Sequence, residues 1–285
     1  QLIVLGIMQD AGIPQAGCTK KCCLSYYDDS TKRRNVVSLG ITDQLNNKNY
    51  IVEATPDFKF QYQKLMGVND SESKNMLNGI FLTHAHIGHY TGLMHLGKEA
   101  MNSSDIPVYV MPRMKKFLQT NGPWDQLVQN KNISLYQLSN EKSVNLSESL
   151  EVIPFEVPHR DEYSETVGYK IIGPEKSALF IPDIDKWDKW EQSISELIRE
   201  VDYAFLDATF YDAVEINNRD ISEIPHPFII ESFEEFNSLS IAEKGKIYFI
   251  HFNHTNPAIN KESNQAKLIL SKGYKIAVEG QIFRL

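Results

Sequence analysis

The sequence predicts one mixed α/β domain over residues 1–285, and three observations support this fold class. Short apolar runs typical of buried strands alternate with segments of helical periodicity. No Ser-, Gly- or Pro-rich linker divides the chain, which contains neither an internal repeat nor a low-complexity segment. A chain of 285 residues with 42% hydrophobic content can bury one substantial core. We therefore expect strands and helices packed around that core.

The expected strands are short, rich in β-branched and aromatic residues, and bounded by turn residues. In chain order they are 2–5, 36–42, 50–53, 80–82, 107–111, 133–138, 150–154, 166–172, 178–181, 203–206, 247–250 and 274–278. Helices are expected at 57–66, 187–201 and 261–271, and near Tyr90. The clearest is 187–201, whose apolar stripe we interpret as part of the core. The stripe consists of Trp187, Trp190, Ile194, Leu197, Ile198 and Val201.

Composition and charge narrow the function classes. The formal charge of −8 disfavours a broad nucleic-acid groove, which would need a basic stripe. No window approaches the roughly 18 consecutive apolar residues of a membrane span. Because Gln1 is not a natural start and residues 2–5 already form a strand, we expect that a tag or a signal peptide was removed. The sequence leaves open which it was, whether this soluble protein is cytoplasmic or exported, and its oligomeric state.

The strongest motif is Thr-His-Ala-His-Ile-Gly-His, which begins at Thr83 and places His84, His86 and His89 directly after an expected strand. A turn at a rigid strand end can direct three imidazoles at one point, and imidazole is the commonest metal ligand. Three of them around one ion leave a position open for water or substrate, as in catalytic zinc sites. Surface histidines are the alternative, which is disfavoured because four of the eight histidines fall between His84 and His95. His95 is expected on the following helix, without a role.

All three cysteines, Cys18, Cys22 and Cys23, lie in one Gly/Pro-rich N-terminal loop. An odd, clustered set is a poor disulfide framework, and pairing the adjacent Cys22 and Cys23 would strain the ring. Thiolates at this spacing suit a structural zinc, which normally has four ligands, so one ligand would come from elsewhere. Free thiols in a mobile loop are the alternative.

Polar residues also follow three later strands. His159 and Asp183 each come shortly after an expected strand, and His251 and His254 follow 247–250. A solitary histidine or aspartate at such a position is usually a turn residue. Together with the triple-histidine loop, in this order, these residues form a constellation.

The constellation resembles the ligand series of the metallo-β-lactamase superfamily, and the likeness covers essentially the whole chain. The superfamily motif His-x-His-x-Asp-His is matched by the three loop histidines, with Gly88 at the aspartate position. His159, Asp183 and His251 match the remaining ligands. The resemblance implies an αββα sandwich with metals at one edge of two sheets.

Several loops also resemble the pyrroloquinoline quinone biosynthesis B proteins, namely 5–15 with the cysteine loop, 53–57, 158–168 and 253–257. The layout is similar to the cyclic phosphodiesterases of phosphonate breakdown as well. Those enzymes carry a structural zinc on clustered N-terminal cysteines and on a histidine three positions beyond the last active-site histidine. Here that histidine is His254, although Lys20 stands where another ligand would be expected.

The resemblance also implies how the ligands divide. His84, His86 and His159 would hold a first ion, and Asp183 would bridge to a second ion held by His89 and His251. Zinc is expected, with iron or manganese as alternatives in the active site. Because Gly88 removes a carboxylate, the second site should bind more weakly.

Three further residues have open interpretations. Asp207 follows a strand and is either a strand-end cap or an outer or replacement ligand. His226 is either a lone loop histidine or, as in some superfamily hydrolases, a proton donor. Arg160 either clamps an anionic substrate or forms a surface ion pair with Asp161 or Glu162.

Three functions remain. The favoured one is a metal-dependent hydrolase that acts on a small, anionic phosphodiester, or on another ester or lactone, through a metal-activated water. The second is an iron-dependent oxidative enzyme resembling the quinone biosynthesis B proteins. The third is a binding protein that kept the fold and lost turnover, for which Gly88 is the only argument.

Overall fold

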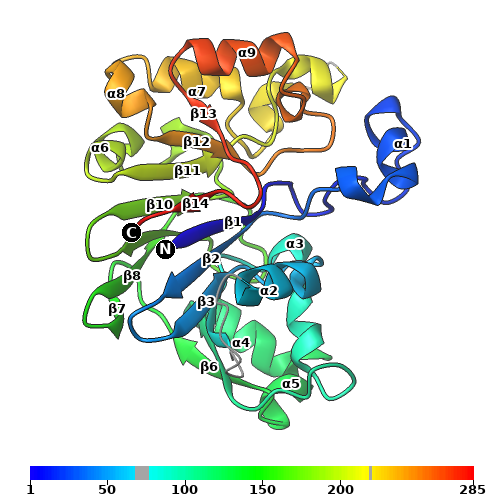
Figure 1. The fold of residues 1–285 in the computed structure, drawn as a ribbon, viewed down its shortest axis with the longest axis vertical. Helices are drawn as coiled ribbons and strands as arrows, with labels where there is room; N and C mark the ends of the chain where they lie inside the picture. The colour runs from blue at the N-terminus through cyan, green and yellow to red at the C-terminus, as the bar shows by residue number, and fades with distance from the viewer. Residues whose placement is uncertain (68–76, 218–219) are drawn as a thin grey trace.

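The computed structural model describes residues 1–67, 77–217 and 220–285, and its strands form two seven-stranded mixed sheets. In spatial order the first sheet contains β14 (Ile282–Phe283), β1 (Leu2–Gly6), β2 (Ser38–Asp43), β3 (Lys48–Val52), β4 (Leu77–Phe81), β5 (Ile106–Val110) and β6 (Ile133–Gln137). The second contains β13 (Lys275–Ile276), β12 (Ile247–Ile250), β11 (Tyr203–Asp207), β10 (Ser177–Ile181), β9 (Val167–Ile172), β8 (Leu150–Glu156) and β7 (Val144–Ser147). The two chain ends lie together because β1 pairs with β14 (Figure 1).

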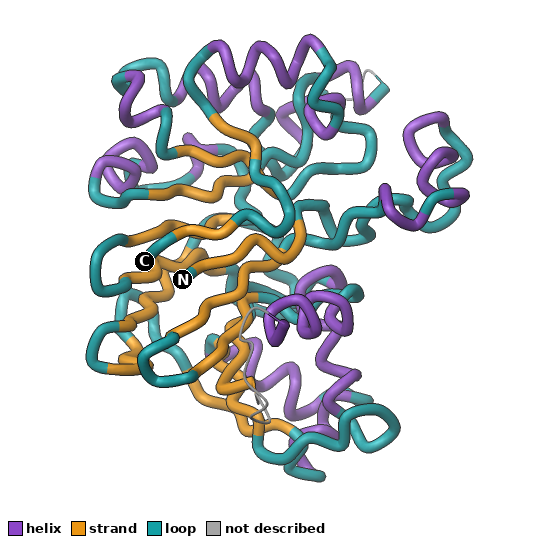
Figure 2. The backbone as a smooth tube through the Cα atoms, viewed as in Figure 1, coloured by secondary structure: helices purple, strands orange, loops and turns teal. Residues whose placement is uncertain are grey.

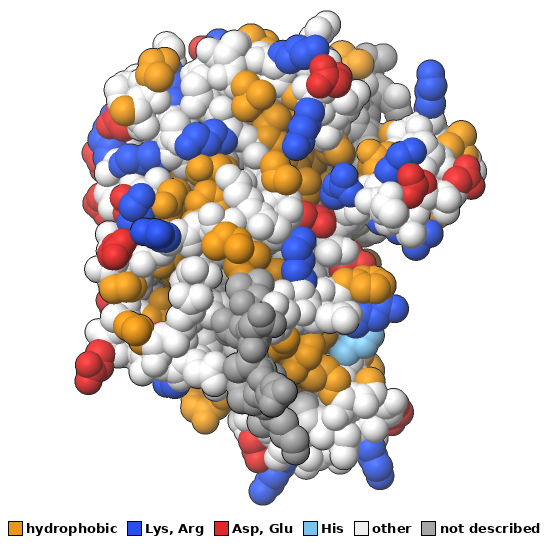
Figure 3. Space-filling view, viewed as in Figure 1, with side chains coloured by type: hydrophobic (Ala, Val, Ile, Leu, Met, Phe, Trp, Pro, Cys, Tyr) orange, Lys and Arg blue, Asp and Glu red, His pale blue; other side chains and the backbone are white. Residues whose placement is uncertain are grey.

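Helices flank both sheets, as Figures 1 and 2 show. Those associated with the first sheet are α2 (Phe58–Gly67), α3 (Ile87–Tyr90), α4 (Pro112–Thr120) and α5 (Trp124–Gln129). Those associated with the second are α6 (Ile194–Arg199), α7 (Ile229–Glu235), α8 (Ile241–Lys244) and α9 (Asn264–Ser271). A separate arm carries α1 (Lys21–Asp28) away from the sheets (Figure 1). On the face drawn in Figure 3, acidic and basic side chains are interspersed.

Strand alternation explains why the layers form. Leu2 and Val4 of β1 pack into the core between the two sheets, whereas Ile3 and Leu5 pack into a second core against the helices. Successive side chains of a strand point to opposite faces, so a strand that is apolar at every position must be covered on both sides. Fully buried strands between helix layers confirm the predicted αββα sandwich.

Two local predictions were wrong. The segment 187–201 is not one helix: a short 3-10 turn, Trp187–Lys189, precedes α6, which starts only after Ser193. Ser193 caps α6 by accepting a hydrogen bond from Glu196 N, and the intervening Trp190 donates its indole N–H to Glu156 O at 3.1 Å. The cysteine segment is not entirely loop, because α1 includes Cys22 and Cys23.

No helix within the described ranges has the length and apolar character that crossing a membrane requires.

Candidate metal centre

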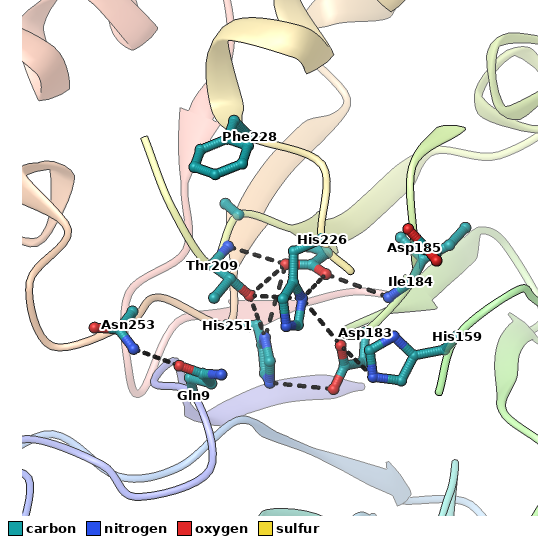
Figure 4. Close-up of polar contacts among 12 residues, drawn as sticks. Gln9, His159, Asp183, Ile184, Asp185, Thr209, His226, Phe228, His251 and Asn253 are labelled. Carbon is teal, nitrogen blue, oxygen red and sulfur yellow. Dashed lines mark hydrogen bonds and ion pairs between the residues drawn. The ribbon is translucent and has the colours of Figure 1, made fainter. Parts of the chain in front are cut away.

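The candidate site lies at one edge of the sandwich, where the strands that precede its residues end. β3, β4 and β5 run parallel in the first sheet, and β10, β11 and β12 do so in the second. Because the carboxyl ends of parallel strands meet at one edge, the loops after β4, β10 and β12 converge there. Asp183 from the loop after β10 and His251 from the loop after β12 point toward one another (Figure 4).

A first cluster contains His84, His86, His159 and Asp183, whose ligand atoms all lie within 4.8 Å of one another. His84 Nε2 is 2.8 Å from His86 Nδ1 and 3.3 Å from Asp183 Oδ2. His159 Nε2 is 3.1 Å from Asp183 Oδ1. Burial lowers the pKa of His159 to about 4 and holds that of His84 well below its usual value, so both rings are neutral and able to bind a metal.

The outer nitrogens of this cluster have their own partners. Thr83 Oγ1 is 2.8 Å from His84 Nδ1, and Glu162 Oε2 is 3.2 Å from His86 Nε2. These contacts orient the rings so that His84 Nε2 and His86 Nδ1 face the centre. Partners of this kind fix the ring orientation of metal-binding histidines.

A second cluster shares Asp183 with the first. Its Oδ2, which also faces His84, is 3.6 Å from His89 Nε2 and 3.7 Å from His251 Nε2. Behind these rings, Glu53 Oε1 is 3.4 Å from His89 Nδ1, and Thr209 Oγ1 is 2.8 Å from His251 Nδ1. In both His89 and His251, Nδ1 faces outward and Nε2 faces the centre. Asp183 therefore lies between the two clusters, as a bridging carboxylate would.

Electrostatics make this edge attractive for cations. Burial opposes ionisation of Asp183, but the surrounding histidines outweigh it and hold its pKa well below the ordinary value. Burial likewise opposes protonation of His89, yet the carboxylates of Glu53 and Asp10 raise its pKa well above the ordinary value. Anionic groups are thus concentrated in a buried place, which favours bound positive charge.

Asp207 and His226 form a third group beside the clusters. His226 Nδ1 is 2.9 Å from Asp207 Oδ2 and 3.1 Å from Asp183 Oδ1. Burial opposes protonation of His226, but Asp207 and Asp183 together raise its pKa to about 10. Asp207 also accepts hydrogen bonds from Ile184 N, Thr209 N and Thr209 Oγ1. Its oxygens are therefore occupied by protein donors, and it is more than a strand-end cap.

The donor set fits divalent cations. Within the described part of the chain, several buried polar atoms at this edge make no hydrogen bond, a situation that costs about 1–3 kcal/mol per atom. Imidazole nitrogens with carboxylate oxygens suit zinc, and they also suit iron or manganese. The unbonded atoms are Oδ1 of Asp10 and of Asp183, both carboxylate oxygens of Glu53, both ring nitrogens of His89 and of His159, and Nε2 of His251.

Arg160 and His95 lie outside the two clusters. The Arg160 side chain is 57% exposed, with Nη2 at 3.5 Å from His86 Nε2 and Nη1 at 3.8 Å from Glu162 Oε1. Asp161 instead pairs with Arg113, at 3.0 Å. His95 lies in a 3-10 helix and stacks on Phe58, with 6.0 Å between ring centroids. Arg160 therefore stands at the rim of the site, and His95 has a packing role.

The cysteine arm meets the body at a separate cluster of Cys18, Cys22, Cys23 and His254. His254 Nδ1 lies 3.4 Å from the Sγ atoms of both Cys22 and Cys23, and Cys18 Sγ lies 3.9 Å from Cys22 Sγ. Burial raises the pKa of the Cys23 thiol to about 12, so a bound metal would have to displace its proton. Three thiols and one imidazole match a closed zinc site.

Two contributors at the site were missed from the sequence. Asp10 follows β1 and Glu53 follows β3, and both contact His89. Both lie in loops that resemble those of the pyrroloquinoline quinone biosynthesis B proteins, but the sequence alone predicts no role for either residue. The signal that could have identified them is an acidic residue just after a strand that ends at the same edge as β4.

Comparisons with known proteins agree with this architecture. Residues 48–252 match the family model described as the Beta-lactamase superfamily domain. The chain is 22% identical over 300 residues to a coenzyme PQQ synthesis protein B of Methylorubrum extorquens (strain PA1), with 98% of each chain covered. Zinc-bound PqqB from Methylobacterium extorquens superimposes with a TM-score of 0.80 at 20% identity, covering 100% of this chain and 99% of that one. A diphosphatase from the PhnP family gives a TM-score of 0.70 at 21% identity, covering 98% and 94%. At such identities, likeness to solved structures shows the fold alone.

Replacing one cysteine tests the arm cluster. We expect Cys23→Ser to lose one zinc ion per chain, because three ligands hold zinc less tightly than four. The thermal midpoint should fall by at least about 5 °C, since each kcal/mol shifts a domain of this size by about 2–4 °C. Metal analysis and thermal unfolding measure both effects, with Ser25→Ala on the exposed side of α1 as the control. Full zinc content in Cys23→Ser would contradict the ligand assignment.

His86→Ala tests the first active-site cluster. The variant should lose active-site metal and keep the zinc of the cysteine cluster, because His86 contributes only to the former. Inductively coupled plasma mass spectrometry of protein purified without added metal measures the stoichiometry. His95→Gln is the matched control, since His95 stacks on Phe58 away from both clusters. Unchanged metal content in His86→Ala would show that His86 is not a ligand.

Proposed function

Because the chain belongs to the beta-lactamase superfamily, as its ligand order predicted, we propose that it is a metal-dependent hydrolase of a small anionic phosphodiester or of another ester or lactone. The observation that carries the proposal is the pairing of two features at one edge. Asp183 lies between two histidine clusters, and His226 stands beside it with Asp207 behind its ring. One feature can hold hydrolytic metal ions, and the other can deliver a proton.

The residues divide the work by position. His84, His86, His159 and Asp183 would hold a first ion, and Asp183, His89 and His251 a second. Bound there, two divalent ions would lower the pKa of water toward about 7 and offset the charge that develops on a phosphoryl or acyl oxygen. The outer partners Thr83, Glu162, Glu53 and Thr209 keep the ligating nitrogens directed inward.

His226 is suited to protonate a leaving group. Asp207 occupies Nδ1 of the ring at 2.9 Å, which leaves Nε2 as the nitrogen that can donate a proton to substrate. Asp207 is fully buried and held by donors from Ile184 and Thr209, so the ring is oriented before substrate arrives. This arrangement favours the proton-donor interpretation of His226 over that of a lone loop histidine.

Arg160 gives the reason to expect an anionic substrate. Its exposed guanidinium lies beside His86, and its present partner, Glu162, is itself 52% exposed. Exposed ion pairs are weak, about 0–1 kcal/mol, so a phosphate or carboxylate could replace Glu162 at low cost. A guanidinium binds such groups through two parallel hydrogen bonds.

A second candidate is an oxidative enzyme with one iron ion. It is favoured by the naming of the curated relatives as coenzyme PQQ synthesis protein B, at 98% coverage of both chains. Nitrogen and carboxylate ligands with open positions also suit iron chemistry.

Hydrolysis assays separate the two candidates. Zinc- or manganese-loaded protein should hydrolyse bis(p-nitrophenyl) phosphate or a lactone at equal rates with and without oxygen, because hydrolysis needs no electron acceptor. Release of nitrophenolate and acid formation report the reaction. Absence of turnover across phosphodiesters, esters and lactones, together with oxygen consumption by the iron-loaded protein, would favour the second candidate.

Replacing His226 tests its proposed role. His226→Ala should lower kcat about 10²- to 10⁴-fold on an alkyl ester or alkyl phosphodiester, whose leaving group needs a proton. The loss should be much smaller on a p-nitrophenyl substrate, because nitrophenolate leaves without protonation. Steady-state kinetics on the two substrates, with metal content measured in parallel, give the comparison. Equal losses on both substrates would assign His226 a positioning role instead.

A further inference from the structure

We propose that Asp10 supplies the second metal ion with the carboxylate that the superfamily motif carries at the position of Gly88. The proposal deepens the proposed function, because it concerns the second of the two ions. It replaces the expectation that this site is weak for want of an anionic ligand. A carboxylate is present, but it comes from the loop after β1.

The space beside Gly88 is the first argument. A Cβ atom built on Gly88 would lie 2.3 Å from Asp10 Oδ1, 2.4 Å from Asp10 Cα and 2.9 Å from Asp10 Cβ. No side chain fits at such distances, so an aspartate at position 88 and the present Asp10 exclude each other. Gly88 and Asp10 therefore depend on each other: Asp10 fills the volume that a side chain at position 88 would occupy.

The contacts of Asp10 are the second argument. Asp10 Oδ1 lies 3.2 Å from His89 Nε2, the nitrogen that also faces Asp183. This oxygen is buried and makes no hydrogen bond with the described residues. The ligand atoms of Asp10, His89 and His251 all lie within 4.8 Å of one another. With the shared Asp183, the second ion would have two imidazoles and two carboxylates.

Backbone pairing holds Asp10 in place. β1 runs in the same direction as β3, because each is antiparallel to β2, so its carboxyl end reaches the metal edge. Met8 bridges to Phe252, and Gln9 N donates to Phe252 O at 2.9 Å. Figure 4 shows Gln9 joined to Asn253 as well. The loop that carries Asp10 is thus paired with the loop that carries His251.

A tight turn follows Asp10. Gly12 N donates to Gln9 O at 2.8 Å, and Gly12 has φ +67°, a conformation that favours glycine. The turn fixes Asp10 between two anchored residues. Two other acidic residues near this site are poorer candidates. Glu53 faces the outer Nδ1 of His89, and four protein hydrogen bonds already occupy the oxygens of Asp207.

Metal titration of the chelator-treated protein tests the proposal. Isothermal titration with Zn²⁺, and visible absorption with Co²⁺, should give two active-site ions per wild-type chain beyond the cysteine-cluster ion. Asp10→Asn should weaken the second ion at least about 10-fold and leave the first unchanged, since even outer partners of ligands alter affinity on this scale. Asp161→Asn, which removes an exposed rim carboxylate, is the matched control and should bind like wild type.

Glycine at position 10 provides a second test. Asp10→Gly should weaken the second ion as Asp10→Asn does, and adding Gly88→Asp should not restore the affinity, because its Cβ would still lie 2.4 Å from the backbone Cα of residue 10. A wild type that binds one active-site ion, or an Asp10→Asn variant that binds two as tightly as wild type, would overturn the proposal. Two tightly bound ions without hydrolysis of any ester would instead overturn the proposed function and leave this assignment standing.

Discussion

The buried charge of Asp183 is the constraint on which the rest of the site depends. Its side chain is 2% exposed, and removing a carboxylate from water costs several kcal/mol unless positive charge or hydrogen-bond donors surround it. Oδ1 lies near His159 and His226, and Oδ2 lies near His84, His89 and His251, so one buried anion contacts both clusters. The rings that contact it come from four separate loops and belong to His84, His89, His159, His226 and His251.

The fold maintains this arrangement at a cost to the backbone. Glu53 and His251 both adopt positive φ, +78° and +66°, which costs a non-glycine residue about 1–3 kcal/mol. Both are fully buried and both support the second cluster. Such strain persists only where neighbouring structure fixes it, and here Glu53 N donates to Phe81 O and Ala54 N to His89 O. These two strained backbone conformations therefore mark residues whose side-chain orientation is needed at the second cluster.

Local sequence patterns were sufficient for the layered fold and for the residues of the first cluster, and pairing between distant segments accounts for what they missed. A strand is recognisable from its own residues, and a residue at its end lies at the edge where the strand ends, which is why His84, His159 and Asp183 were expected to lie together, as they do. The position of Asp10 depends on the pairing of Met8 with Phe252, and no local sequence pattern predicts that pairing. The break in the helix expected at 187–201 was missed for a similar reason. The spacing of its apolar residues is the same whether or not Trp190 leaves the helix to donate a hydrogen bond to Glu156 O.

The cysteine arm and the candidate metal centre share one short segment, which links their geometries. His251 directs its ring to the second cluster, and His254, three residues later, meets the thiols of the arm. Between them Asn253 bonds Gln9, next to Asp10, while Gln15 N on the same N-terminal segment donates to Cys23 Sγ at 3.4 Å. The segment from β1 to α1 is thus anchored to the loop after β12 at both ends. An ion among the thiols would tighten that connection, and the residues it steadies are those that present Asp10 and His251 to the second ion. Zinc among the thiols would therefore also stabilise the position of the N-terminal loop that carries Asp10.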